Sequence, residues 1–266
     1  MNRIEERFAA LKEQGVKGLV VYIGAGDPNL GATERLALGF DQAGVDILEL
    51  GIPFSDPLAD GIVNQLAAQR GLDAGTTPGG VFDCVRRIRK TSEIPIVLYV
   101  YYNLLHQRGL TAFIDEASAA GVDGLLVLDL PPEEADAYQA AMNEAKLLPI
   151  YLIAPTTPEE RIHYIASQAK GFVYYVSREG VTGMQRQISE TIGPMTELIR
   201  KHTDLPIAIG FGISDAAQAK RVAQYGEACV VGSAVVNRIA DLGDSPQLVD
   251  EVAGFARDLN EALKAS

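Results

Sequence analysis

The sequence of 266 residues contains no tryptophan, two cysteines and three histidines. Cys84 and Cys229 stand far apart and without the spacing of metal ligands, so neither a disulfide framework nor a cysteine metal site is expected. No apolar run reaches the roughly 18 residues of a membrane span. The charged amino terminus also lacks the apolar core of a signal peptide. We therefore expect a cytoplasmic protein.

Basic residues are also in short supply. Lys and Arg number 23 against 35 Asp and Glu, which gives a formal net charge of −12. Nucleic acids and anionic membranes bind to basic surfaces, so neither is an expected partner. Hydrophobic residues make up 47% of the chain, enough for a large core, and no linker or low-complexity tract divides it. We expect a single domain over residues 1–266.

Short apolar runs recur along the chain and alternate with segments of helical period. Continuous hydrophobicity is typical of parallel strands that are buried on both faces. The eight runs cover residues 19–25, 46–52, 95–101, 124–130, 149–154, 172–177, 206–211 and 229–232. Eight strand–helix alternations predict a TIM barrel and fit it better than a doubly wound open sheet.

Two further helices are expected beyond the eight repeats. An extra amino-terminal helix covers residues 2–14, before the first strand. A short helix over residues 235–239 follows the eighth strand, at the place where many TIM barrels bind a phosphate group.

Local signals predict where other helices begin and end. A proline followed by two glutamates predicts helix starts at Pro132 and Pro158, because acidic residues are favourable at the positive end of a helix. Asp215 is expected to begin another helix, which Gly226 ends.

Ionisable residues at the carboxyl ends of the strands are the candidates for chemistry, since TIM-barrel sites lie there. No lysine falls inside a predicted strand, which disfavours a Schiff-base aldolase. His163 and His202 fall on outer helices and only His106 follows the third strand. A histidine-bound catalytic metal is therefore disfavoured, and no metal is expected.

Carboxylates remain as candidates. Glu49 lies inside the second apolar run, where burial would raise its pKa and make it a general acid near neutral pH. A surface position or a structural pair with arginine are the alternatives. Asp129 ends the fourth run and could serve a site or tie down a loop. Asp56 and Asp60 lie in a long insertion after the second run, where aspartates usually form turns.

Glycines and tyrosines supply the remaining candidates. Gly212 and Gly232 follow the seventh and eighth runs, where backbone N–H groups could bind a phosphate or the glycines could simply form tight turns. The glycine-rich segment 177–185 suits either a lid or a passive loop. Four tyrosines fall in strands and would line a pocket if they point inward, or else pack in the core. They are Tyr22, Tyr99, Tyr101 and Tyr174.

The segment Glu49-Leu50-Gly51-Ile52-Pro53-Phe54-Ser55-Asp56-Pro57-Leu58-Ala59-Asp60-Gly61 closely resembles the signature of the tryptophan synthase alpha subunit family. Further motifs match in order, and the resemblance spans the whole chain. They are Gly26-Asp27-Pro28, Ser177-Arg178, Gly180-Val181-Thr182-Gly183, Gly210-Phe211-Gly212-Ile213-Ser214 and Gly232-Ser233-Ala234. The resemblance implies a lyase of tryptophan biosynthesis that cleaves indole-3-glycerol phosphate to indole and glyceraldehyde 3-phosphate by a retro-aldol reaction without a cofactor.

The resemblance also implies roles for particular residues. Glu49 and Asp60 match the catalytic carboxylates, and Tyr174 matches a tyrosine beside them. The implied substrate-binding residues are Tyr22, Tyr101, Thr182, Gly183, Gly212, Gly232 and Ser233. Pro53 and Asp56 match the surface that faces a beta subunit. That partner, expected in an alpha2beta2 complex, condenses indole with serine by means of pyridoxal phosphate.

Four positions depart from the family pattern. Val21-Tyr22-Ile23-Gly24 stands where Pro-Phe-(Ile/Val)-Thr is common, and Ile62 stands where proline is usual. Two alternative functions stay open: a free-standing indole-3-glycerol-phosphate lyase, and a catalytically weak activator of a beta subunit. A sugar-phosphate isomerase would share the phosphate loops but leaves the insertion after the second strand unexplained.

Overall fold

The structure, a computed structural model, describes residues 2–176 and 192–265. Its parallel strands form a closed barrel in which each strand pairs with the next and the last pairs with the first. The strands are β1 (Gly18–Gly24), β2 (Ile47–Gly51), β3 (Ile96–Val100), β4 (Gly124–Val127), β5 (Leu148–Ile153), β6 (Val173–Val176), β7 (Ile207–Gly210) and β8 (Ala228–Val231). The predicted TIM barrel, with its eight strands in order, is confirmed.

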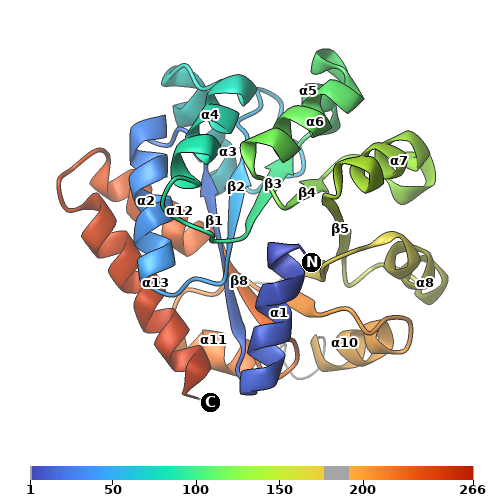
Figure 1. The fold of residues 1–266 in the computed structure, drawn as a ribbon. Coiled ribbons are helices and arrows are strands. Elements are labelled where there is room, and N and C mark those ends of the chain that lie inside the picture. Colours follow the sequence, from blue (N-terminus) through green and yellow to red (C-terminus); the bar gives the residue numbers. More distant parts are fainter. Residues whose placement is uncertain (1, 177–191, 266) are drawn as a thin grey trace.

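Helices surround the barrel on its outside (Figure 1). They are α1 (Arg3–Gln14), α2 (Leu30–Gln42), α3 (Ile62–Asp73), α4 (Pro78–Ile88), α5 (Tyr102–Arg108), α6 (Leu110–Ala120), α7 (Asp136–Ala145), α8 (Glu159–Gln168), α10 (Gly193–Arg200), α11 (Ala216–Val222), α12 (Ser233–Leu242) and α13 (Leu248–Lys264), with a 3₁₀ helix, η1 (Pro132–Glu134), before α7. No described helix is both long enough and apolar enough to cross a membrane.

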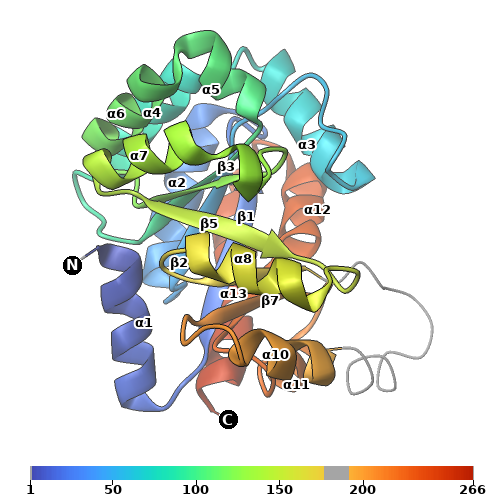
Figure 2. The same cartoon turned by 90° about the vertical axis from the view of Figure 1, so that its right-hand side faces the viewer.

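The extra amino-terminal helix is α1, and it closes one end of the barrel. Its cap is reciprocal: the Asn2 side chain accepts the Ile4 N–H at 3.0 Å, and the Glu5 carboxylate accepts the Asn2 N–H at 3.0 Å. Phe8 packs against Phe172, just before β6, with ring centroids 5.6 Å apart. Figure 2 shows α1 beside the end of the barrel at which the strand arrows begin.

Alternate residues of each strand point into the barrel. On β2, Ile47 belongs to the cluster of apolar side chains inside the barrel. Leu48 and Leu50 pack outward in the larger cluster between the strands and the helices. By the same alternation, Glu49 and Gly51 face the interior.

The fourth strand is shorter than its apolar run predicts. β4 ends at Val127 rather than at residue 130. Beyond it, the Asp129 carboxylate accepts the N–H of Tyr102, the first residue of α5, at 2.7 Å. Asp129 therefore ties down a loop, which is one of the two roles considered for it.

Three helix boundaries also differ from the prediction. The N–H of Ala135 bonds to the carbonyl of Pro132, three residues back, so Pro132 opens a 3₁₀ turn and α7 begins only at Asp136. α11 ends at Val222 rather than at Gly226. A Cβ at Gly226 would lie 2.7 Å from a carbonyl oxygen of β7, so this glycine serves a close approach and not a helix stop. The helix after β8, α12, spans ten residues and is longer than expected.

Candidate active site

Glu49 lies on β2 with its side chain inside the barrel. It is 1% exposed, and among the described residues its carboxyl group has no hydrogen bond or ion pair. Burial, with a smaller contribution from the nearby charge of Asp60, raises the pKa of Glu49 to about 8. The group therefore carries its proton at neutral pH. A surface position, one of the two alternatives for Glu49, is therefore wrong, and none of the described arginines pairs with it, which was the other alternative.

Asp60 lies in the loop between β2 and α3, at the carboxyl end of the barrel. Tyr99 donates its hydroxyl proton to Asp60 Oδ1 at 2.5 Å, and Tyr101 donates to Oδ2 at 2.7 Å. Gln65, in the first turn of α3, donates to the Asp60 carbonyl oxygen at 2.9 Å. The carboxylate is thus buried and held by two phenols, while the Asp60 N–H closes a turn by donating to the Pro57 carbonyl oxygen at 3.0 Å.

Tyr99 is one of the four strand tyrosines considered from the sequence, but the family resemblance assigns it no role. Tyr99 and Tyr101 lie two residues apart at the end of β3, so their side chains share one face of the sheet. That spacing is the available signal in the sequence. Tyr101 also stacks on Phe54, with centroids 5.1 Å apart, and its hydroxyl oxygen accepts the Ala59 N–H at 3.1 Å. These contacts fix the loop that carries Asp60.

Tyr22 and Tyr174 complete a group of tyrosines around the two carboxyl groups. The Tyr22 ring meets the Tyr99 ring edge-on, with centroids 4.9 Å apart. Tyr174, on β6, is half-buried, and burial followed by the charges of Glu49 and Asp60 raises the pKa of its phenol. Both Tyr22 and Tyr174 therefore lie at the barrel mouth with the carboxyl groups, as a pocket requires.

Two of these tyrosine hydroxyl groups lie where the side chain of a neighbouring residue would be if that residue were not glycine. A Cβ at Gly51 would lie 2.5 Å from the Tyr22 hydroxyl, and a Cβ at Gly210 would lie 3.0 Å from the Tyr174 hydroxyl. The departure at Gly24 also has a steric reason, because a Cβ there would lie 3.3 Å from the Cβ of Ala67 on α3.

The residues predicted to bind phosphate lie after neighbouring strands. Gly212 follows β7 with a φ of +59°, in the left-handed region that favours glycine. Gly232 follows β8, and Ser233 is the first residue of α12, so this helix begins next to the barrel mouth. The amino end of such a helix attracts anions. Thr182, Gly183 and the predicted lid lie outside the described residues.

The loop after β2 carries the two residues predicted to face a partner. Asp56 is exposed, whereas Pro53 is buried and packs against Gly71 of α3, at 3.3 Å from the position a Cβ would take. Three large apolar side chains are exposed to solvent nearby, and no pattern in the sequence distinguishes them. They are Leu58, Ile62 and Leu66, which are 80%, 66% and 52% exposed.

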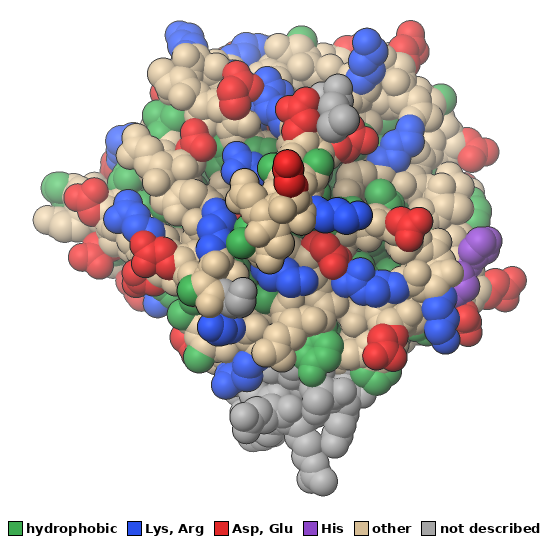
Figure 3. Space-filling view, turned by 60° about the horizontal axis from the view of Figure 1, so that its bottom comes forward, with side chains coloured by type: hydrophobic (Ala, Val, Ile, Leu, Met, Phe, Trp, Pro, Cys, Tyr) green, Lys and Arg blue, Asp and Glu red, His purple; other side chains and the backbone are tan. Residues whose placement is uncertain are grey.

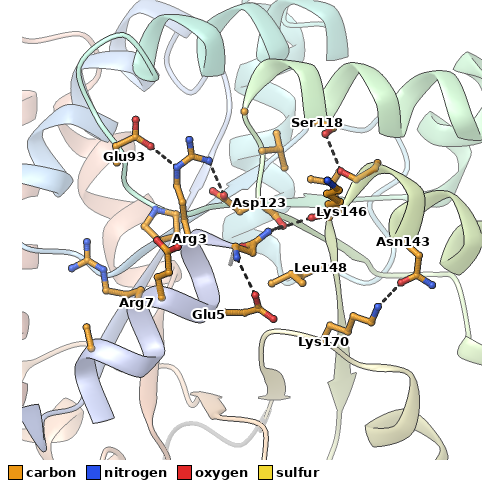
Figure 4. Close-up of a pocket in the computed structure, with 18 residues that line it drawn as sticks. Arg3, Glu5, Arg7, Glu93, Ser118, Asp123, Asn143, Lys146, Leu148 and Lys170 are labelled. Carbon is orange, nitrogen blue, oxygen red and sulfur yellow. Dashed lines mark hydrogen bonds and ion pairs between the residues drawn. The ribbon is translucent and has the colours of Figure 1, made fainter. Parts of the chain in front are cut away.

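The other end of the barrel, at which the strands begin, has a hollow of about 1290 Å³ against α1 (Figure 4). Its charged groups bind one another. Arg3 contacts Glu93 at 2.5 Å and Asp123 at 3.0 Å, and Lys170 bonds to Asn143. The two pairs of Arg3 fasten α1 to the barrel, at the end away from the carboxyl ends of the strands. Figure 3 shows acidic and basic side chains interspersed over one face, without a field of one sign.

The described residues contain no cluster of His, Cys, Asp or Glu side chains that could hold a metal ion. His163 lies on α8 and His202 follows α10, where their rings meet edge-on, with centroids 5.4 Å apart. Of the histidines, His106 lies on α5, after β3. Among the described residues, the ionisable groups inside the barrel mouth are therefore carboxyl and phenol groups.

A closed parallel barrel with buried carboxyl groups at the carboxyl ends of its strands defines the class: this is a TIM-barrel enzyme. The family model described as tryptophan synthase alpha chain matches residues 8–264. The chain belongs to the tryptophan synthase alpha chain family, as the segment after Glu49 implied.

Individual relatives agree over their full length. The tryptophan synthase alpha chain of Opitutus terrae is 49% identical over 265 residues, which cover 99% of this chain and 100% of that protein. The tryptophan synthase alpha chain of Alkalilimnicola ehrlichii is 47% identical over 266 residues, which cover 100% of this chain and 96% of that protein. The crystal structure of tryptophan synthase subunit alpha from Legionella pneumophila has a TM-score of 0.90 and 34% identity, and 100% of each chain is covered.

Proposed function

We propose that this chain cleaves indole-3-glycerol phosphate with Glu49 as the group that moves the protons. The family assignment makes the chain a lyase that serves as the alpha subunit in tryptophan biosynthesis. The observation that carries the role of Glu49 is its burial inside the barrel with a pKa of about 8. A carboxyl group that is neutral at pH 7 is what a general acid needs.

Two proton transfers by Glu49 break the bond between indole C3 and the glycerol chain. Glu49 first gives its proton to C3, which places positive charge on the indole nitrogen. The Glu49 carboxylate then takes the proton of the hydroxyl group on the adjacent chain carbon. The carbon–carbon electrons move into the ring, the hydroxyl oxygen becomes the aldehyde of glyceraldehyde 3-phosphate, and Glu49 is again protonated.

Asp60 acts by charge in this scheme. An ionised carboxylate that accepts the indole N–H stabilises the positive charge that develops on the nitrogen. The hydroxyl groups of Tyr99 and Tyr101 favour this ionised form, because they donate to both of its oxygens. Tyr174 stands beside the two carboxyl groups, and Tyr22 and Tyr101 line the pocket for the ring.

The phosphate group binds to backbone N–H groups in our proposal. Gly212, Gly232 and Ser233 supply these donors at the ends of β7 and β8. Thr182 and Gly183 stay predictions for the same site. No cofactor is needed by this chain, which acts as one domain over residues 1–266, and its cytoplasmic location stays a prediction.

We place the docking site for a tryptophan synthase beta subunit on the loop after β2 and on the first turns of α3. Ile62 and Leu66 lie one turn apart on α3, so they share a face, and Leu58 is exposed before them. Exposed apolar side chains that are grouped in this way are typical of protein interfaces. Asp56 lies in the same loop, and the buried Pro53 packs that loop against Gly71 of α3.

An alpha2beta2 complex is the assembly we expect. The beta subunit brings pyridoxal phosphate and uses the indole that this chain releases.

The direct test is incubation with indole-3-glycerol phosphate and measurement of indole release. The parent chain is expected to release indole, Glu49→Gln to lose nearly all activity, and Asp60→Asn to lose about 10²–10³-fold in kcat, because it keeps the shape but removes the charge. Glu134→Gln, on an exposed carboxyl group, is the matched control and should keep the parent rate. A Glu49→Gln variant as fast as the parent would refute the proton-transfer role.

A second experiment compares turnover with and without a beta subunit. Strong stimulation is expected for an alpha subunit, and equal turnover alone would favour the free-standing lyase. Leu58→Ser combined with Ile62→Ser should weaken the stimulation without lowering the rate of the chain alone. Stimulation of the beta subunit by Glu49→Gln would measure the activator role separately from catalysis.

A further inference from the structure

Three phenols and one carboxylate meet at the mouth of the barrel, and the ring of one phenol, Tyr99, contacts the ring of another, Tyr22. Tyr99 donates to Asp60 Oδ1 at 2.5 Å, at the short end of the range for a hydroxyl bonded to a carboxylate. Tyr22 presses edge-on against the Tyr99 ring at 4.9 Å. Tyr99 lies opposite Gly51 in the strand register, and the Tyr22 hydroxyl occupies the space that a side chain at Gly51 would fill.

Little free space is left within this group. The cavity between Tyr22, Asp60, Tyr99 and Tyr101 has a volume of about 10 Å³, about the size of one water molecule. The Tyr99 ring is therefore closely packed on the side of Tyr22. Its hydroxyl group is directed at Asp60 by the strand on one side and by the Tyr22 ring on the other.

We propose that Tyr99 is a positioning residue for catalysis, which keeps Asp60 ionised and oriented toward the indole nitrogen. This assignment rests on the proposed function. Tyr101 bonds to the other oxygen and to the Ala59 N–H, so its role is shared between the carboxylate and the loop. Tyr99 has the carboxylate as its hydrogen-bond partner, and removal of its hydroxyl group isolates the effect on Asp60.

The charge balance around Asp60 explains why a donor is needed. Glu49 on β2, Tyr22 on β1 and Tyr174 on β6 face the same space, along with Tyr99 and Tyr101 from β3. None of these groups is a cation. With no positive side chain in this set of described residues, the negative charge of Asp60 is stabilised by hydrogen bonds from the phenols of Tyr99 and Tyr101. Loss of one of two such donors favours the protonated form, which cannot stabilise a positive indole nitrogen.

The substitution Tyr99→Phe tests this assignment, because it keeps the ring and removes only the hydroxyl group. We expect kcat to fall at least about tenfold at pH 7 with KM changed by less than about threefold, since the bond acts on charge in the transition state. We also expect the acidic limb of the kcat/KM profile to move to higher pH, because the hydrogen bond from Tyr99 favours the charged carboxylate. Glu49 is neutral over that range, so its titration does not affect this limb.

Tyr138→Phe is the matched control. Tyr138 is a buried phenol on α7 that donates to the Leu125 carbonyl oxygen at 3.3 Å, away from the carboxyl groups. Its loss should leave the pH profile in place. A Tyr99→Phe profile that matches the parent overturns the proposal, and so does a fall in rate without movement of the acidic limb.

A second variant covers the case in which Tyr99→Phe fails to fold. Replacement of Tyr99 by 3-fluorotyrosine keeps the ring and the bond but makes the phenol a stronger donor, so the acidic limb should move to lower pH. An unmoved limb in this variant also overturns the proposal. The proposed function fails separately, and takes this assignment with it, if the parent chain releases no indole or if Glu49→Gln keeps the parent rate.

Discussion

Glu49 couples the stability of the barrel to pH, and its replacement by glutamine should remove that coupling. The pKa of this group is raised from 4.5 to about 8 in the folded chain. The folded state therefore holds the proton more tightly than the unfolded state, and the free energy of unfolding falls as the pH rises from 4.5 to 8. Below that window the contribution of Glu49 is fully present, and above it the contribution is lost.

The size of this effect follows from the two pKa values. Their difference, at about 1.4 kcal/mol per pH unit, gives a full change of about 5 kcal/mol. Between pH 6 and pH 9 the change is about 3 kcal/mol, because part of the window lies below pH 6. Glutamine has the shape of the protonated carboxyl group and does not titrate, so the variant lacks this loss.

Urea unfolding followed by circular dichroism at pH 6, 7.5 and 9 measures the effect. The quantity of interest is the free energy of unfolding of the parent minus that of Glu49→Gln, in which titration of the other groups cancels. We expect this difference to decrease with rising pH. Glu134→Gln, on an exposed carboxyl group, should give a difference that does not change. A pH-independent difference for Glu49→Gln would refute the argument that burial governs this group.

Three other predictions concern the site and the scaffold. The kcat/KM for indole-3-glycerol phosphate should fall as the pH rises through about 8, because Glu49 then lacks the proton that it donates, and a profile flat to pH 10 would contradict this. Asp27 is 1% exposed and is bonded by Arg70 through two contacts of 2.7 Å. Arg70→Gln leaves that charge unpaired and should lower the free energy of unfolding in urea by about 3 kcal/mol, whereas Arg86→Gln, at an exposed pair on α4, should lower it by less than about 1 kcal/mol. Phe8→Ala should lower it by about 3–5 kcal/mol through the cavity left beneath the barrel, and a loss under about 1 kcal/mol would mean that α1 does not support the barrel.

The strands were predictable because parallel strands buried on both faces are apolar throughout, and this pattern is visible in the sequence alone. The ends of the strands and helices were less predictable. β4 stops short because Asp129 bonds to the N–H of Tyr102, a contact between segments that follow different strands. Gly226 has the sequence position of a helix stop, although its role is the close approach to β7. Both depend on contacts that periodicity does not report.

The residues of the site also differ in whether the sequence alone predicts them. Glu49 could be selected from the sequence because an acid inside an apolar strand is costly unless its environment neutralises it. The bond from Tyr99 to Asp60 could not, because it forms only when the loop after β2 folds over the end of β3. The spacing of Tyr99 and Tyr101 is compatible with one shared face, but it does not show that this face meets Asp60. The exposed Leu58 and Ile62 were likewise hidden, since exposure is a property of the folded surface.

The helix α1 closes one end of the barrel, and this closure limits the routes by which Glu49 can exchange protons with solvent. With that end closed, an ion lost from Glu49 to the medium would have to be replaced through the opening that the substrate occupies. The proposed reaction needs no proton exchange with solvent, because Glu49 gives a proton to the indole ring and then receives one from the hydroxyl group of the same substrate molecule. Glu49 is therefore protonated again at the end of each turnover, and the next substrate can react without a separate step that reprotonates it from the solvent.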